Sequence, residues 1–294
     1  MNHSLASTLF VSDLDGTLLR KDATLSRHTI QTLHQLIEEG MAFTYATARS
    51  IQSAKRVTEG LRLRLPVITR NGSVFADQET EAILEKAIFS KEDVSLLKSL
   101  LPELPHCGFV SSYIGDEMTK TYCDGELSVG LQEYVADHAD DHRMQVAADP
   151  NALWGEQSGY VTMIDDYEKL APTYARVRSY SNWECVFQKD TYGEEYWLEI
   201  CPKNSTKAKA LLKLKERLGF EKLVVFGDSV NDVSMFEIAD EAYAVSNAMD
   251  ELKQIATAVI GNNEEDAVAN ALQKFRDAAV TNTLQNIRNK ANKI

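Results

Sequence analysis

The chain has few cysteines, and none of them are clustered. Its four cysteines are spread over 294 residues, with no CxxC pair and no spacing typical of a zinc site. The six histidines likewise form no HxH or HxxxH pattern. A disulfide-stapled domain and a Cys/His metal centre are therefore not expected, and the thiols are expected to stay reduced, as is usual in the cytosol.

Long hydrophobic segments are also missing. No apolar run approaches the roughly 20 residues that a membrane-spanning helix needs. The first seven residues have neither the basic segment nor the apolar segment of a signal peptide. We therefore expect a cytoplasmic protein that is not embedded in a membrane.

Positive charge is scarce in this sequence. The chain has 31 Lys and Arg against 44 Asp and Glu, a formal net charge of -13. A field of that sign disfavours nucleic acid and anionic membranes, and it gives a phosphorylated metabolite no long-range attraction. Any phosphate site must therefore depend on local hydrogen-bond donors and a bound cation. The sequence gives no indication of the oligomeric state.

Strand and helix patterns alternate at both ends of the chain. Over the first 70 residues, short apolar segments alternate with amphipathic helical ones, and the pattern returns from Ser205 onward. This β-α-β order with short links predicts an α/β core with a Rossmann-like parallel sheet covered by helices.

The middle of the chain has a different composition. All three tryptophans and nine of the eleven tyrosines lie between Tyr113 and Trp197, where strand-like and helical pieces are mixed. We therefore expect a core formed by residues 1–79 and 194–294, and an inserted α+β domain formed by residues 80–193.

Two acidic segments follow apolar strands, one in each half of the predicted core. Asp13 and Asp15 come directly after the first strand, and their i, i+2 spacing places them on one side, roughly 7 Å apart. Asp228 and Asp232 follow a strand near the carboxyl end in the same way. Acids at the carboxyl ends of neighbouring parallel strands converge, and a cation such as Mg²⁺ relieves their repulsion. This pattern predicts a site for Mg²⁺-dependent phosphoryl transfer.

Two further segments offer groups that suit a phosphate. Thr47, Ala48 and Arg49 lie between a strand and a helix, where a hydroxyl and backbone N–H groups are available. Lys207 lies in the first turn of its helix, where a cation opposes the helix dipole and is most easily explained by a nearby anion.

Together these segments resemble the four motifs of haloacid dehalogenase-superfamily phosphatases. The motifs are Asp13–Thr17, Thr47, Lys207 and Gly227–Asp232. The large insertion between the second and third motifs resembles the Cof-like branch, which carries a type IIB cap. Asn71-Gly72-Ser73 is similar to the turn before that cap, and Leu198-Glu199-Ile200 to the strand that follows it. The resemblance covers essentially the whole chain and implies that the inserted domain is a cap.

The resemblance implies a role for each motif residue. Asp13 would be the nucleophile that forms an aspartyl-phosphate, and Asp15 the general acid and then the general base. Asp13, the backbone carbonyl of Asp15, and Asp228 would hold Mg²⁺, with Asp232 supporting the metal and its waters. The groups implied to bind phosphoryl oxygens are Thr47, the backbone N–H groups of Leu14 and Ala48, Lys207 and Asn231. Arg49 would be either a substrate contact or a structural ion pair.

Three short segments depart from the family pattern. The second motif reads Thr-Ala-Arg instead of Thr-Gly-Arg, the third reads Lys-Asn-Ser-Thr-Lys, and the segment before Asn247 lacks its usual glycine. None of these changes removes a charged catalytic group. The expected function is hydrolysis of a small phosphorylated metabolite, such as a sugar phosphate or nucleotide. The alternatives are a phosphotransferase or phosphomutase using the same aspartyl-phosphate, and a sensor that binds a phosphometabolite without turnover.

Overall fold

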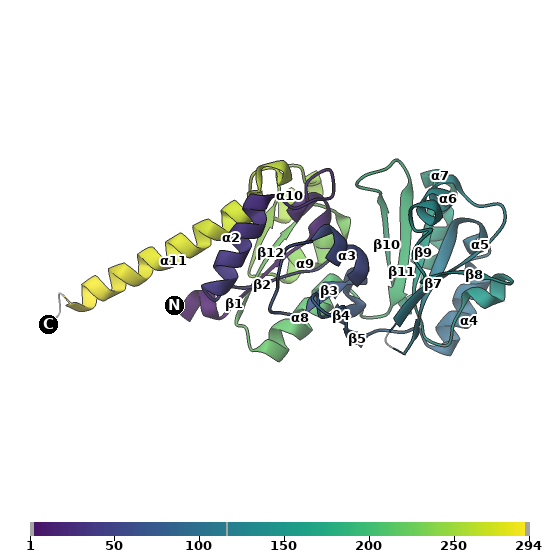
Figure 1. Cartoon of the computed structure of the whole chain (residues 1–294), viewed down its shortest axis with the longest axis horizontal. Coiled ribbons are helices and arrows are strands. Elements are labelled where there is room, and N and C mark those ends of the chain that lie inside the picture. Colours follow the sequence, from purple (N-terminus) through teal and green to yellow (C-terminus); the bar gives the residue numbers. More distant parts are fainter. Residues whose placement is uncertain (1–2, 116, 292–294) are drawn as a thin grey trace. The chain divides into compact units, whose positions relative to one another are not determined.

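The computed structural model describes residues 3–115 and 117–291. The chain divides into two compact units, one formed by residues 1–81 and 207–294 and the other by residues 82–206 (Figure 1). The first unit therefore contains both ends of the chain, and the second is an insertion within it. None of the helices in the described part is long and apolar enough to cross a lipid bilayer.

The first unit is built on a parallel sheet of five strands. Its order is β14-β13-β12-β1-β2, with neighbours paired in parallel. All five residues of β1 are buried, as expected for an apolar strand inside a sheet that helices cover. The strands of this unit are β1 (Thr8–Ser12), β2 (Ala42–Tyr45), β3 (Val67–Thr69), β4 (Val74–Ala76), β12 (Lys222–Gly227), β13 (Glu241–Ala244) and β14 (Ala258–Val259).

Helices connect and cover these strands. The helix α2 begins after Ser26, whose side chain accepts a hydrogen bond from the Thr29 N–H, and it packs against α11. The helix α8 packs against α9. The helices of the unit are α1 (His3–Ala6), α2 (Arg27–Glu38), α3 (Ile51–Val57), α8 (Lys207–Leu218), α9 (Val233–Ile238), α10 (Asp250–Ile255) and α11 (Ala267–Ala291). These elements confirm the α/β class expected from the sequence.

One predicted strand of the core has a second partner besides the one expected. Residues 66–69 were expected to continue the parallel sheet, but β3 pairs antiparallel with β4. The expected parallel contact is limited to a single parallel bridge between Ala46 and Ile68, which links β3 to the end of β2. The reason is the tight turn between β3 and β4, where Arg70, Asn71 and Gly72 all have positive φ, at 52°, 51° and 103°.

The second unit contains a mixed sheet of six strands. Its order is β10-β11-β9-β6-β7-β8, antiparallel except for the pair β7–β8. The strands of this sheet are β6 (Gly108–Ile114), β7 (Glu117–Cys123), β8 (Met144–Ala147), β9 (Ser158–Asp165), β10 (Trp183–Lys189) and β11 (Tyr196–Pro202). The unit also contains β5 (Ile83–Lys86), which is not part of this sheet. The helices are α4 (Lys91–Leu100), α5 (Leu104–Cys107), α6 (Val129–Asp137) and α7 (Tyr167–Val177).

Alternating residues of this sheet contribute to two apolar clusters. Val110 and Val161 belong to a large cluster that includes residues of α4 and α7, whereas Phe109 and Ile164 form a smaller one with residues of α6. The period of two along each strand sends neighbouring side chains to opposite faces, so helices pack on both faces of this sheet.

The carboxyl end of the second unit lies beyond the expected boundary. The insertion was expected to end at residue 193, but the second unit extends to residue 206. Seven residue pairs join β10 to β11 in an antiparallel hairpin, and β11 also pairs with β9. Because these ladders hold Tyr196–Pro202 in the middle of the sheet, the chain leaves this unit only after β11.

Candidate active site

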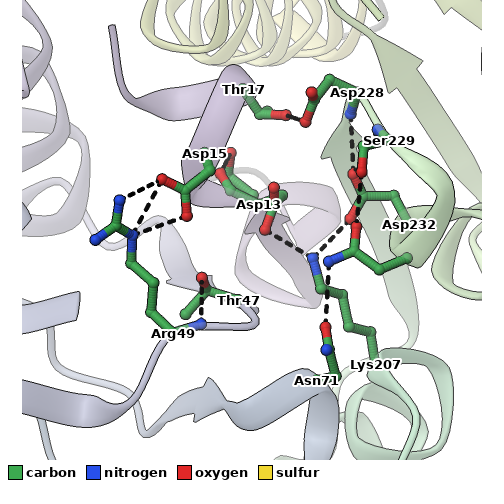
Figure 2. Close-up of polar contacts among 12 residues, drawn as sticks. Asp13, Asp15, Thr17, Thr47, Arg49, Asn71, Lys207, Asp228, Ser229 and Asp232 are labelled. Atoms are coloured by element: carbon green, nitrogen blue, oxygen red, sulfur yellow. Dashed lines mark hydrogen bonds and ion pairs between the residues drawn. The ribbon is translucent and has the colours of Figure 1, made fainter. Parts of the chain in front are cut away.

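The two acidic segments meet at the carboxyl ends of β1 and β12. These strands are neighbours, with Ser12 of β1 opposite Phe226 of β12. The Asp13 N–H extends the pairing by donating to the Phe226 carbonyl at 2.9 Å. The sheet therefore fixes the backbone of Asp13 beside the segment that carries Asp228 and Asp232 (Figure 2).

A buried lysine joins acids from both segments. Lys207 Nζ donates to Asp13 Oδ1 and to Asp232 Oδ1, each at 2.7 Å, and its side chain is only 1% exposed. The other Asp232 oxygen, Oδ2, accepts hydrogen bonds from the backbone N–H groups of Asp228 at 2.9 Å and Ser229 at 3.1 Å. Lys207 and Asp232 thus have fixed orientations, and both are oriented toward Asp13 (Figure 2).

The charges at this position do not balance within the protein. Burial raises the pKa of Asp13 to about 7, and the neighbouring Asp232 and Asp15 add to this effect against the opposing influence of Lys207. Burial likewise raises the pKa of Asp228 well above its usual value. Burial alone would lower the pKa of Lys207, but Asp13 and Asp232 raise it above its ordinary value, so the ammonium stays charged. With one lysine facing three carboxylates, all three can be ionised together only if a further cation balances their charge. Without such a cation, the raised pKa values of Asp13 and Asp228 favour protonation.

The donor set fits a hard cation. Asp13, Asp228 and Asp232 each have an oxygen that lies within 4.8 Å of the others. Carboxylate oxygens are the ligands that hard divalent cations prefer, and such an ion would offset the excess negative charge. Asp228 is further oriented by the Thr17 hydroxyl, which donates to its Oδ1 at 2.8 Å. The cluster can therefore hold a metal ion, whereas the carboxylate of Asp15 binds a different partner, Arg49.

Gly16 brings the backbone close to this cluster. Its φ is +75°, and a Cβ atom built there would lie 2.3 Å from Asp228 Oδ2. We expect Gly16→Ala to displace the Asp228 carboxylate and to weaken Mg²⁺ binding at least about tenfold, measured by calorimetric titration. Backbone strain should also lower the free energy of unfolding by about 1–3 kcal/mol.

Gly219 supplies a matched control for that substitution. Its φ is +73°, but no other atom of the described chain lies within 4 Å of a Cβ built there. Gly219→Ala should therefore cost similar stability through backbone strain while leaving Mg²⁺ affinity unchanged. Equal Mg²⁺ affinities for the two variants would show that the close contact with Asp228 is unimportant.

Three of the expected phosphate-binding residues, Leu14, Thr47 and Ala48, follow the ends of two neighbouring strands, β1 and β2. Thr47 is fully buried, its N–H donates to the Ile68 carbonyl at 2.9 Å, and its hydroxyl oxygen accepts from the Arg49 N–H at 3.2 Å. Ala48 lies between these two residues in the chain, and Leu14 is the buried residue between Asp13 and Asp15. The roles expected for Leu14, Thr47 and Ala48 stay predictions.

Two asparagines contribute contacts that the sequence did not indicate. Asn71, which we expected to be a turn residue, is buried with a left-handed backbone and accepts a hydrogen bond from the Asn231 side chain at 3.1 Å. Asn247 donates to the Gly16 carbonyl at 2.7 Å and so supports the loop after Asp15. The positions of these residues in the motifs could have marked them as candidates, but their partners lie 160 and 231 residues away.

Comparisons with known proteins agree with this geometry. A family model described as haloacid dehalogenase-like hydrolase matches residues 10–272. The 5-amino-6-(5-phospho-D-ribitylamino)uracil phosphatase YitU of Bacillus subtilis is 26% identical over 271 residues, which cover 91% of this chain and 97% of that protein. The pyridoxal phosphate phosphatase YbhA of Escherichia coli is 27% identical over 276 residues, covering 90% and 97% of the two chains.

A solved structure extends this similarity to the fold. The crystal structure of TM0651 from Thermotoga maritima aligns with a TM-score of 0.68 and 25% identity, covering 90% of this chain and 96% of that one. The family match and the phosphatase relatives confirm the family and the enzyme class expected from the sequence. The chain belongs to the haloacid dehalogenase-like hydrolases.

Proposed function

We propose that this protein is a Mg²⁺-dependent phosphomonoester hydrolase in which Asp13 is the nucleophile. The observation that carries this proposal is the buried arrangement in which Lys207 bridges Asp13 and Asp232 at 2.7 Å, with Asp228 beside them. A lysine that is only 1% exposed and is held against a carboxylate suits a site that binds a dianionic phosphate group.

The reaction has two steps on the same carboxylate. In the first, an Asp13 oxygen forms a bond to phosphorus while the bond from phosphorus to the leaving oxygen breaks, and Asp15 gives that oxygen a proton. In the second, water attacks the aspartyl-phosphate and gives a proton to Asp15, and the bond between Asp13 and phosphorus breaks. Inorganic phosphate leaves, and both aspartates return to their starting states.

The remaining motif residues bind and orient the phosphoryl group. Asp13, Asp228 and the backbone carbonyl of Asp15 would hold Mg²⁺, and Asp232 would support the metal and its waters. When bound, Mg²⁺ supplies positive charge that offsets the carboxylates and the phosphate. The phosphoryl oxygens would be bound by the Thr47 hydroxyl, the Leu14 and Ala48 N–H groups, Lys207 and Asn231.

The substrate is proposed to be a small phosphorylated metabolite. The relatives are named for a phosphoribityl uracil derivative and for pyridoxal phosphate, both compact phosphomonoesters with a ring. A net charge of -13 gives such a substrate no long-range attraction, so recognition would depend on contacts within the site. We assign selection of the substrate to the inserted unit, residues 82–206, in the role of a cap.

Phosphate release from a panel of metabolites tests this proposal. With Mg²⁺ present, we expect release from at least one of pyridoxal phosphate, flavin mononucleotide, nucleoside monophosphates and hexose phosphates. Removal of the metal with EDTA should lower the rate at least about 100-fold, and excess Mg²⁺ should restore it. Activity that persists in EDTA would contradict the metal role. A protein that binds these compounds without releasing phosphate would indicate a sensor, and transfer to a second hydroxyl would indicate a phosphotransferase.

A further inference from the structure

Arg49 makes a forked contact with Asp15. Its Nε donates to Asp15 Oδ2 at 2.8 Å and to Oδ1 at 3.0 Å, and its Nη2 donates to Oδ1 at 2.6 Å (Figure 2). The two side chains are 17% and 20% exposed. A planar guanidinium that contacts both oxygens fixes the plane of a carboxylate as well as its position.

Arg49 is itself held at three points. Its backbone N–H donates to the Thr47 hydroxyl oxygen at 3.2 Å, and its carbonyl accepts from the Arg70 N–H at 3.0 Å. At the tip of the side chain, Nη1 donates to the Ser53 hydroxyl at 3.0 Å. With the backbone and one end of the guanidinium fixed, the Nε and Nη2 edge is directed at Asp15.

We propose that Arg49 is a positioning residue that holds the Asp15 carboxylate in the orientation needed for proton transfer. This inference rests on the proposed function, in which Asp15 protonates the leaving oxygen. It decides between the two roles open to Arg49 from the sequence, in favour of an ion pair that acts through Asp15. Nε and Nη2 both donate to Oδ1, so these two hydrogen bonds can persist when Oδ2 carries the proton that Asp15 transfers. Proton transfer requires that oxygen within hydrogen-bond reach of the leaving oxygen, so an Asp15 side chain free to rotate would transfer its proton less often.

If Arg49 has this role, the effect of replacing it should depend on the leaving group of the substrate. An alkoxide leaves phosphorus slowly unless it is protonated, whereas p-nitrophenolate is stable enough to leave without a proton. In the first step, a residue that acts through Asp15 therefore affects alkyl phosphates much more than p-nitrophenyl phosphate. The difference is expected in kcat/KM, which covers the steps up to release of the leaving group and leaves out hydrolysis of the aspartyl-phosphate, a step that all substrates share. A residue that binds the phosphate group affects both substrates alike, because they share that group.

The test compares Arg49→Gln and Arg49→Lys with the unaltered protein, on glycerol 2-phosphate and on p-nitrophenyl phosphate with Mg²⁺. For Arg49→Gln we expect kcat/KM on glycerol 2-phosphate to fall about 100-fold and kcat/KM on p-nitrophenyl phosphate to fall less than about 3-fold. Arg49→Lys keeps the charge but lacks the fork, so its loss on glycerol 2-phosphate should be about tenfold. Equal losses of kcat/KM on both substrates would overturn the proposal.

Further variants separate this inference from the proposed function and from unfolding. Asp15→Asn should show the same dependence of kcat/KM on the leaving group, and if it does not, the proton-donor role of Asp15 is wrong independently of Arg49. Absence of activity in the unaltered protein would instead contradict the proposed function. Arg56→Gln, at an exposed position of α3, should leave both rates unchanged. If Arg49→Gln fails to fold, Ser53→Ala provides the test. It removes only the hydrogen bond from Nη1 and should cause a smaller loss that again depends on the leaving group.

Discussion

Replacing Asp13 with Asn is expected to lower kcat for phosphate release at least about 10⁴-fold, because the amide keeps the shape of the side chain but cannot attack phosphorus. The fold should tolerate the change. Burial raises the pKa of Asp13 to about 7, so the site already disfavours the charged carboxylate, and a neutral side chain of the same size fits it. Steady-state kinetics on the best substrate of the panel measure the effect.

A matched aspartate controls for a general effect of removing a carboxylate. Asp250 is on α10 with its side chain 89% exposed, and Asp250→Asn should keep full activity. Thermal unfolding of Asp13→Asn should occur at or above the temperature of the unaltered protein. Activity of a few per cent in Asp13→Asn would show that another group is the nucleophile.

Replacing Lys207 with Met is expected to lower the free energy of unfolding by about 3–5 kcal/mol in the absence of metal. The substitution leaves Asp13 and Asp232 buried without the cation that contacts both at 2.7 Å. Denaturant unfolding in EDTA measures this loss. Added Mg²⁺ should recover part of it, because a bound cation offsets the same two carboxylates.

Two comparisons make the lysine prediction specific. Lys215→Met removes a cation from the same helix, but its partner Asp240 is 45% exposed, so the change should cost less than about 1 kcal/mol. The double variant Lys207→Met with Asp232→Asn should be more stable than Lys207→Met, because it removes one of the unpaired charges. Unfolding of Lys207→Met at the free energy of the unaltered protein would contradict the electrostatic account of the site.

The sequence predicted the convergence of acids because that depends on simple regularities. Asp13 follows one apolar strand and Asp228 another, and parallel neighbouring strands place their carboxyl ends at one edge. The α/β class of the core and the presence of an inserted domain were predictable for the same reason, since they follow from the order of the elements. Strand geometry did not predict how the Asp13 and Asp15 carboxylates are placed. Both residues follow the end of β1, and their carboxylates bind different partners, Lys207 and Arg49.

The partners of individual side chains were not predictable in this way. Asp15 accepts hydrogen bonds from Arg49, and Asp232 accepts one from Lys207. These pairings depend on side-chain rotamers and on the packing of elements that lie far apart in the sequence. The end of the inserted unit was misplaced because the residue pattern of a strand does not reveal which sheet it joins. In the structure, β11 pairs with β9 and β10 and so belongs to the sheet of the inserted unit. The antiparallel pairing of β3 depends on the left-handed backbone of Asn71, which is common for that residue type, and of Arg70, which is not.

The most direct test of the account is to locate the phosphoryl group on the protein. Asp15→Asn mixed with p-nitrophenyl phosphate and Mg²⁺ should form the aspartyl-phosphate, because this leaving group needs no proton, and should hydrolyse it slowly, because the general base is missing. After an acid quench, peptide mass spectrometry should find the phosphoryl group on Asp13. The same variant treated with EDTA should carry no phosphoryl group, and neither should the double variant Asp13→Asn with Asp15→Asn. Release of p-nitrophenol and phosphate together with no labelled protein, or a label on a different residue, would contradict the account.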